Sequence, residues 1–137
     1  MISLEAPIGM EDAKALVRTA VGELGTSIEW AGKTERDLGD FSVYVGVIEK
    51  FFLRNGSYAS LTIVITGDGS SSRVEAIGSG AGDGLLNIGL GAHQAFERDF
   101  ESALRENGYE WSSSASPAWR TKTSVLPSAS ERSGAKA

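Results

Sequence analysis

The chain of 137 residues has the length of one domain, and folding a chain of this size buries roughly 65 % of the surface that it exposes when unfolded. The sequence contains no cysteine, which excludes disulfides, thiolate metal sites and a cysteine nucleophile. Residues 1–108 carry nine Lys/Arg against sixteen Asp/Glu, and because so acidic a body repels phosphate backbones, we expect no nucleic-acid binding.

The first residues, MISLEAPIGMEDAK, show neither the basic start nor the apolar run of a secretion signal. No apolar run in the chain reaches the roughly 18 residues that a membrane helix needs. We therefore expect a cytoplasmic protein of bacterial type with no membrane partner.

Residues 10–24 carry apolar side chains at helical spacing, with Glu11 and Asp12 in a first turn and Gly25 as a stop. The apolar positions are Ala13, Leu16, Val17, Ala20, Val21 and Leu24. This pattern predicts an amphipathic helix whose apolar stripe covers a sheet rather than forming a groove for a partner.

Residues 26–36 alternate less regularly, with Ile28 and Trp30 as apolar positions among polar ones. They predict an edge strand, and its charged residues discourage pairing with a further strand. Leu38-Gly39-Asp40 then predicts a turn into the centre of the sheet.

Asn55-Gly56, between two β-rich runs, is a strong hairpin signal because both residues tolerate the positive φ that a tight turn needs. A two-residue turn places Arg54 opposite Ser57 and, farther along, Ile48 opposite Ile63. The second run is then two-faced. Its apolar face holds Ala59, Leu61, Ile63 and Ile65, and its polar face holds Ser60, Thr62 and Thr66.

The first run does not fit this register, because Val43, Val45 and Val47 fall on the face opposite Ile48. One solution is a bulge near Glu49-Lys50, which returns the valines to the core and leaves both charges in water. The other is that both faces of the sheet are buried, the second against another subunit. We favour the bulge, since long strands commonly need one to curve over a core.

Residues 73–79 continue the meander as a third run. Pairing Ile65 with Val74 places Val74, Ala76 and Gly78 on the core face. These residues are small, so they leave room for a helix to lie close.

The segment 78–91 holds six glycines ahead of a second predicted helix. One interpretation is a ligand site, in which the backbone N–H groups of Gly80, Gly82 and Gly84 face an anion beside His93 and Arg54. The other is a connector, in which glycine lets backbones pass close together. Neither G-x-G-x-x-G nor a P-loop pattern occurs in the segment, which favours the connector.

Residues 92–106 predict the second helix, which ends at Asn107-Gly108. Its buried stripe is Phe96, Phe100, Ala103 and Leu104. We assign its charged residues, Glu97 among them, to the solvated side.

Residues 109–137 contain eight serines from position 112 onward and no periodicity. We therefore expect a single α+β domain over 1–108 and a flexible, serine-rich tail over 109–137. Trp111 and Trp119 are the exceptions, since tryptophan is expected to bind either the body or a partner.

Several short motifs occur in an order that other proteins share. They are Leu38-Gly39-Asp40, the V-x-V-x-V-x-E-x-F run from Val43 to Phe51, Arg54, Ala59-Ser60-Leu61-Thr62 and Ala76-Ile77-Gly78-Ser79-Gly80. On these motifs the chain, from about residue 10 to 106, resembles a family of small uncharacterised bacterial domains of unknown function. The resemblance implies the order helix, meander, A-x-G-S-G-x-G, helix, and it brings no activity.

Catalytic groups are few in this sequence. His93 is the only histidine, which excludes multi-histidine metal sites. Ser79, His93 and Asp83 lack the G-x-S-x-G motif that would support a triad. Asp68 and Asp83 supply one acid per loop, too few oxygens for calcium. We assign no catalytic residue, no cofactor and no metal site.

Together these elements predict an α+β fold in the order α-β-β-β-β-α, with one four-stranded antiparallel meander sheet and two helices packed on one face. We expect a non-enzymatic interaction module whose partner is a second copy of the chain or an unknown protein. The interface residues of this hypothesis are Val43, Val45, Val47, Trp111 and Trp119. The alternative is a small-ligand or anion-binding domain that uses the segment 78–91.

Overall fold

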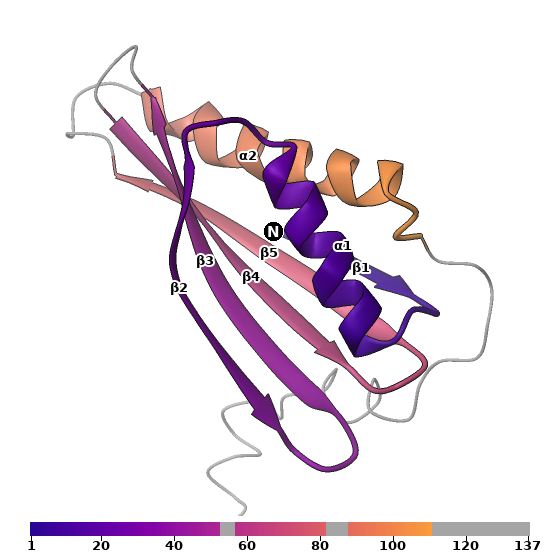
Figure 1. Ribbon diagram of the computed structural model, residues 1–137. Coiled ribbons are helices and arrows are strands. Elements are labelled where there is room, and N and C mark those ends of the chain that lie inside the picture. Colours follow the sequence, from indigo (N-terminus) through magenta and orange to yellow (C-terminus); the bar gives the residue numbers. More distant parts are fainter. Residues whose placement is uncertain (53–56, 82–87, 111–137) are drawn as a thin grey trace, which may run out of the picture.

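The computed structural model describes residues 1–52, 57–81 and 88–110, which form a sheet and two helices (Figure 1). In chain order the elements are β1 (Ile2–Ala6), α1 (Met10–Gly22), β2 (Ile28–Asp37), β3 (Ser42–Phe52), β4 (Ser57–Gly67), β5 (Ser72–Ala81) and α2 (Ile88–Glu106). The predicted α+β class is confirmed. No helix among the described residues is long and apolar enough to cross a membrane.

The sheet has five antiparallel strands in the spatial order β1-β5-β4-β3-β2, and the predicted four is therefore wrong. The additional strand is β1, which pairs with the first half of β5 and places Leu4 opposite Val74. Its five residues are too few to establish an alternating pattern, and its partner lies about seventy residues away in the sequence. The element order is consequently β-α-β-β-β-β-α.

The ladder between β3 and β4 is regular from Ser42 to Phe52, so the predicted bulge at Glu49-Lys50 is wrong. Ile48 lies opposite Leu61, which corrects the predicted register by two residues. The Asn55-Gly56 turn itself lies outside the described residues. The predicted pairing of Ile65 with Val74, between β4 and β5, is confirmed.

Each central strand buries alternate residues, which defines two faces of the sheet. The inner face carries Tyr44, Ile48, Leu61, Ile63, Ile65, Val74 and Ala76, all buried in the hydrophobic core. The outer face carries Val43, Val45, Val47, Thr62 and Val64, which alternate with them and are half-buried. The valines therefore lie on the outer face, because Tyr44 and Ile48 already occupy the inner one.

The edge strand β2 is irregular, as predicted, with a register shift between Trp30 and Gly32. The Trp30 ring lies over Gly46 of β3, where an added Cβ would come within 2.6 Å of a ring carbon. Glycine at position 46 thus makes space on the inner face for the indole of the neighbouring strand.

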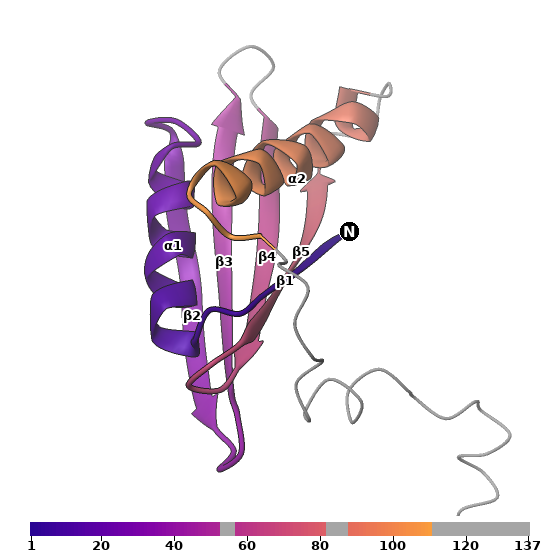
Figure 2. The same ribbon diagram turned by 90° about the vertical axis from the view of Figure 1, so that its right-hand side faces the viewer.

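The two helices contact each other, and both contact β4 and β5. Figure 2 shows them lying together over the strands. The predicted stripe of α2 is buried at Phe96, Phe100, Ala103 and Leu104. That of α1 is buried at Ala13, Val17, Ala20 and Val21, whereas Leu16 and Leu24 are only half-buried against the core. The end of α2 is also as predicted, since Gly108 has a φ of +91°.

Two hydrogen bonds hold the residue Tyr109, which follows α2, against the sheet. The Ser72 hydroxyl donates to the carbonyl of Ile8 at 2.7 Å and lies 2.9 Å from the hydroxyl of Tyr109. Because the single Ser72 proton goes to Ile8, the Tyr109 hydroxyl is the donor to Ser72. Tyr109 is fully buried, so the chain just beyond α2 is held against the start of β5.

Candidate functional site: the outer face of the sheet

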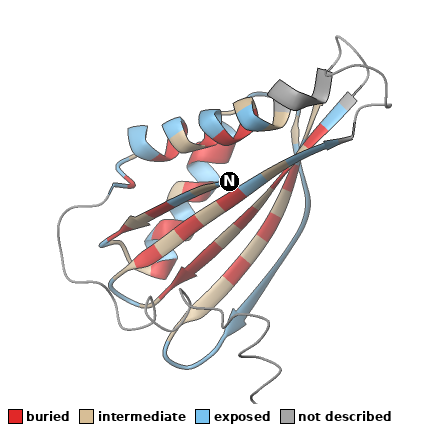
Figure 3. Cartoon of the chain, turned by 180° about the vertical axis from the view of Figure 1, so that it is seen from behind, coloured by how far each residue is buried: buried red, intermediate tan, exposed pale blue. Residues whose placement is uncertain are grey.

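The centre of the outer face is apolar. Val45 of β3 lies opposite Val64 of β4, and Val47 lies opposite Thr62. Ile77 of β5 lies opposite Thr62 on its other side and is 50 % exposed. Figure 3 views the molecule from behind, and the strands there show alternating buried and half-buried residues. The centre of the outer face is therefore mostly apolar, with Thr62 between Val47 and Ile77 and with Glu75 of β5 opposite Val64.

An aromatic pair extends this surface along β3 and β4. Phe51 lies opposite Tyr58, and their ring centroids are 4.8 Å apart with a tilt of 47°. Tyr58 is 55 % exposed. A contact of this geometry between neighbouring strands stabilises the hairpin, and it leaves a large apolar area open to a partner.

Charged residues lie on two sides of the apolar centre of the outer face. At one end of the face Arg36 of β2 is opposite Val43, and Arg73 of β5 pairs with Glu5 of β1 through a charge-assisted hydrogen bond of 2.8 Å. On the opposite side of the apolar centre, before the Phe51–Tyr58 pair, Glu29 of β2 lies opposite Glu49 of β3, and both are exposed. The apolar centre is thus bordered on one side by Arg36 and the Arg73–Glu5 pair, and on the other side by Glu29 and Glu49.

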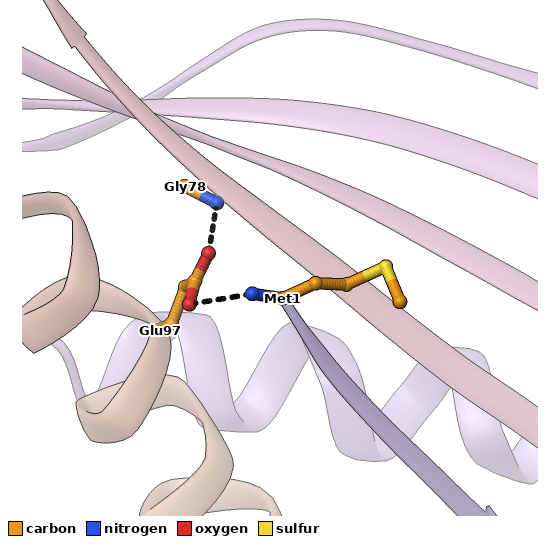
Figure 4. Close-up of polar contacts among 3 residues, drawn as sticks. All are labelled: Met1, Gly78 and Glu97. Carbon is orange, nitrogen blue, oxygen red and sulfur yellow. Dashed lines mark hydrogen bonds and ion pairs between the residues drawn. The ribbon is translucent and has the colours of Figure 1, made fainter.

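A second feature lies where β1 ends along β5. The ladder between the two strands stops at Ala76, two residues before Gly78. There the Gly78 N–H donates to Oε1 of Glu97 at 2.7 Å, and the Met1 ammonium lies 3.0 Å from Oε2 (Figure 4). The Glu97 side chain takes the position of a strand partner for this part of β5.

Glu97 is 8 % exposed, so its assignment to the solvated side of α2 is wrong. Burial acts to raise the pKa of Glu97, but the hydrogen bond from Gly78 and the Met1 ammonium outweigh it and lower that pKa. Positions 93, 97, 100 and 104 recur at helical spacing, so Glu97 lies on the same side of α2 as Phe100 and Leu104. This spacing could have predicted the burial of Glu97, but a charged residue is normally assigned to the solvated side.

The predicted ligand residues are only partly described. Gly80 is an exposed residue of β5, and His93 lies in α2 with its carbonyl beside Gly78. Arg54, Gly82 and Gly84 lie outside the described residues. The carboxylate of Glu97 already accepts the Gly78 N–H, so this N–H is not open to an anion.

The predicted interface residues are also only partly described. Val43, Val45 and Val47 lie together on the outer face, all half-buried. Trp111 and Trp119 lie outside the described residues. The interface hypothesis did not include Val64, Ile77, Phe51 or Tyr58, which the regular ladders place on the same face as the valines.

A cleft of about 350 Å³ lies between the start of α1 and the turn that joins β2 to β3. Its acidic lining residues are Glu11, Asp12, Asp37, Asp40 and Asp68. Two of them act within turns: Asp37 accepts the Gly39 N–H at 3.0 Å, and Asp68 accepts the N–H of Ser70 at 2.8 Å. Across the described residues, no three acidic, histidine or cysteine side chains are grouped to hold a metal ion.

The chain was also compared with known proteins. The comparisons with curated proteins and with solved structures gave no match. A family model, described as a family of unknown function and designated DUF6054, matches residues 2–108. This match includes all seven helices and strands, β1 among them. The chain therefore belongs to DUF6054, a family of unknown function.

Proposed function

We propose that the protein is a non-enzymatic interaction module that forms a homodimer through the outer face of its sheet. In this proposal both helices cover the inner face, and the outer face is left for a second copy of the chain. The observation that carries it is the apolar centre formed by Val45, Val47, Val64 and Ile77 on the face opposite the core. A face of this composition is typical of an interaction surface.

The size of the outer face suits a stable dimer. Four strands of ten or eleven residues and the five-residue β1 present roughly 700 Å² on one face, at about 4.8 Å between strands and about 3.3 Å per residue. A specific protein interface buries about 800 Å² per partner. Stacking two outer faces would therefore bury close to the area that a specific complex needs, in the manner of two sheets packed face to face.

The edges of the sheet favour stacking of faces over pairing of strands. At one edge β2 has the sequence IEWAGKTERD and is exposed along nearly its whole length, and its charges oppose edge-to-edge association. At the other edge, beyond the end of β1, the carboxylate of Glu97 accepts the hydrogen bond that the Gly78 N–H of β5 would otherwise offer to another strand. A second copy is therefore expected on the face rather than at an edge.

The experiment compares the dissociation constant of the dimer in the wild-type chain with that of Val45→Lys. Lysine at position 45 brings two charges into the centre of the interface, so we expect dimerisation to weaken at least about a hundredfold. Leu38→Lys is the matched control, because Leu38 is 57 % exposed in the turn after β2, away from the centre of the outer face. Equal dissociation constants for all three proteins would contradict the proposal.

A further inference from the structure

The charges that border the outer face specify how two copies would be oriented. Arg36 lies on one side of the apolar centre, next to Val43, and Glu29 and Glu49 lie on the other side. From Val43 to Glu49 along β3 is about 20 Å at roughly 3.3 Å per residue. Opposite charges thus lie on opposite sides of the apolar centre along the same pair of strands, β2 and β3.

Glu29 and Glu49 lie directly opposite each other on neighbouring strands. Two like charges in this position destabilise a sheet, and a positively charged side chain between them would offset the repulsion. Glu29 and Glu49 are both exposed on the outer face, so a second copy of the chain can supply this positively charged side chain.

We infer that the dimer of the proposed function has a two-fold axis that runs across the strands, so that the strands of the two sheets are antiparallel and Arg36 of each copy faces Glu29 and Glu49 of the other. This axis places β2 over β2 and β3 over β3 with their ends exchanged. A two-fold interface repeats every contact twice, so the dimer gains two such charge clusters. The apolar residues Val45 and Val47 then meet at the centre.

The other two-fold arrangement, with its axis along the strands, is disfavoured by charge. It keeps the ends together and exchanges the two sides of the sheet, so that β2 faces β5. Arg36 would then face Arg73, whose charge Glu5 already balances. Glu49 would face Ser60 of β4, and Glu29 would face Ser79 of β5. The first arrangement joins opposite charges and the second joins none, so charge complementarity favours the first.

This inference rests on the proposed function, and charge reversal tests it separately. We expect Arg36→Glu alone to weaken the dimer by about tenfold or more, because it sets three acidic groups together in each cluster. The double variant Glu29→Arg, Glu49→Arg should weaken it similarly, since it sets three basic groups together. A mixture of the two variants should form a heterodimer about as tight as the wild-type dimer, because every cluster in it joins opposite charges.

Lys33→Glu is the matched control for the single variant. Lys33 is also exposed on β2, but it lies opposite Gly46 and hence on the side of the inner face. Lys33→Glu changes the charge by the same amount as Arg36→Glu, and we expect it to leave the dissociation constant of the dimer unchanged. Circular dichroism and the melting temperature establish that each variant is folded.

The outcomes separate the two claims. Monomeric wild-type chain would overturn the proposed function. A wild-type dimer whose affinity is unchanged or increased by Arg36→Glu would overturn the antiparallel orientation alone. Weakened homodimers that recover affinity when the two variants are mixed support the orientation, and this recovery should diminish as salt is added.

Discussion

The backbone N–H of Gly78 donates to the carboxylate of Glu97 at 2.7 Å, at the point where β1 no longer accompanies β5. An edge strand with free backbone groups is a site for unwanted pairing. Here the Glu97 side chain of α2 accepts the hydrogen bond of the Gly78 N–H, in the place of another strand. The same carboxylate lies 3.0 Å from the Met1 ammonium, so one acidic residue joins α2, β5 and the start of β1.

Replacing Glu97 by glutamine tests this contact. The amide oxygen still accepts the Gly78 N–H, but the charge is lost, so we expect the free energy of unfolding to fall by about 1 kcal/mol at neutral pH. Equilibrium denaturation measures this loss. Glu101→Gln is the control one turn along α2, where the pair with Arg105 is partly exposed and its loss should cost under about 0.5 kcal/mol.

The contribution of Glu97 should also depend on pH. Its pKa is lower in the folded chain than the usual 4.5, so its stabilising effect is fully present above that pH. The effect is lost as the pH falls through the lowered pKa of the folded chain. We expect the difference in unfolding free energy between wild type and Glu97→Gln to be constant above about pH 5 and to shrink in more acidic solution. A difference that stays constant down to pH 3 would show that the charge of Glu97 does not stabilise the fold.

Gly78 is also a point where the backbone of α2 lies close to the sheet. A Cβ at this position would lie 2.5 Å from the backbone oxygen of His93, which cannot move without moving the helix. We expect Gly78→Ala to lower the free energy of unfolding by about 2 kcal/mol or more. Gly80→Ala is the control two residues along β5, where the nearest atom would be 3.8 Å away. Thermal or chemical denaturation that finds the two alanine variants equally stable would refute the close packing.

The buried hydroxyl of Tyr109 gives a fourth prediction. Tyr109→Phe removes the donor to Ser72 in a fully buried position and should cost about 1 kcal/mol at neutral pH. Tyr58→Phe should cost little, because Tyr58 is 55 % exposed. Urea denaturation of the two variants beside the wild type measures the contrast, and equal losses would contradict it.

Alkaline solution extends the same comparison. Burial raises the pKa of Tyr109 to about 12, from an ordinary value of 10.0. The contribution of the neutral Tyr109 hydroxyl to the stability of the fold is therefore fully present below pH 10, and it is lost as the pH rises toward the pKa of the folded chain. We expect the advantage of the wild type over Tyr109→Phe to shrink above pH 10, as followed by denaturation in alkaline buffers. An advantage that is unchanged above pH 10 would argue against a raised pKa.

The sequence was sufficient for the elements whose patterns are long. Both helices have apolar stripes of several turns, and β4 alternates cleanly from Ala59 to Ile65, so these were predicted with their buried residues. The pairing of Ile65 with Val74 followed from the same alternation. The short strand β1 was missed, because five residues carry too little pattern.

The outer face shows why the site was harder to predict than the fold. In the sequence, Val43, Val45 and Val47 fall on the face opposite Ile48, and the bulge is the favoured solution because long strands commonly need one to curve over a core. The regular ladder instead puts apolar residues on both faces. On the inner face Gly46 lacks a side chain and so admits the Trp30 ring of β2, a contact between strands that spacing within one strand cannot reveal.

The most direct test of a dimer through the outer face is the molecular mass of the wild-type chain in solution, measured by light scattering over a dilution series. One chain has a mass of 14.4 kDa. We expect twice that mass at high micromolar concentration and a reversible fall toward the single-chain mass on dilution, with Val45→Lys remaining at the single-chain mass throughout. A wild-type chain that has the mass of one copy at every concentration would contradict the account.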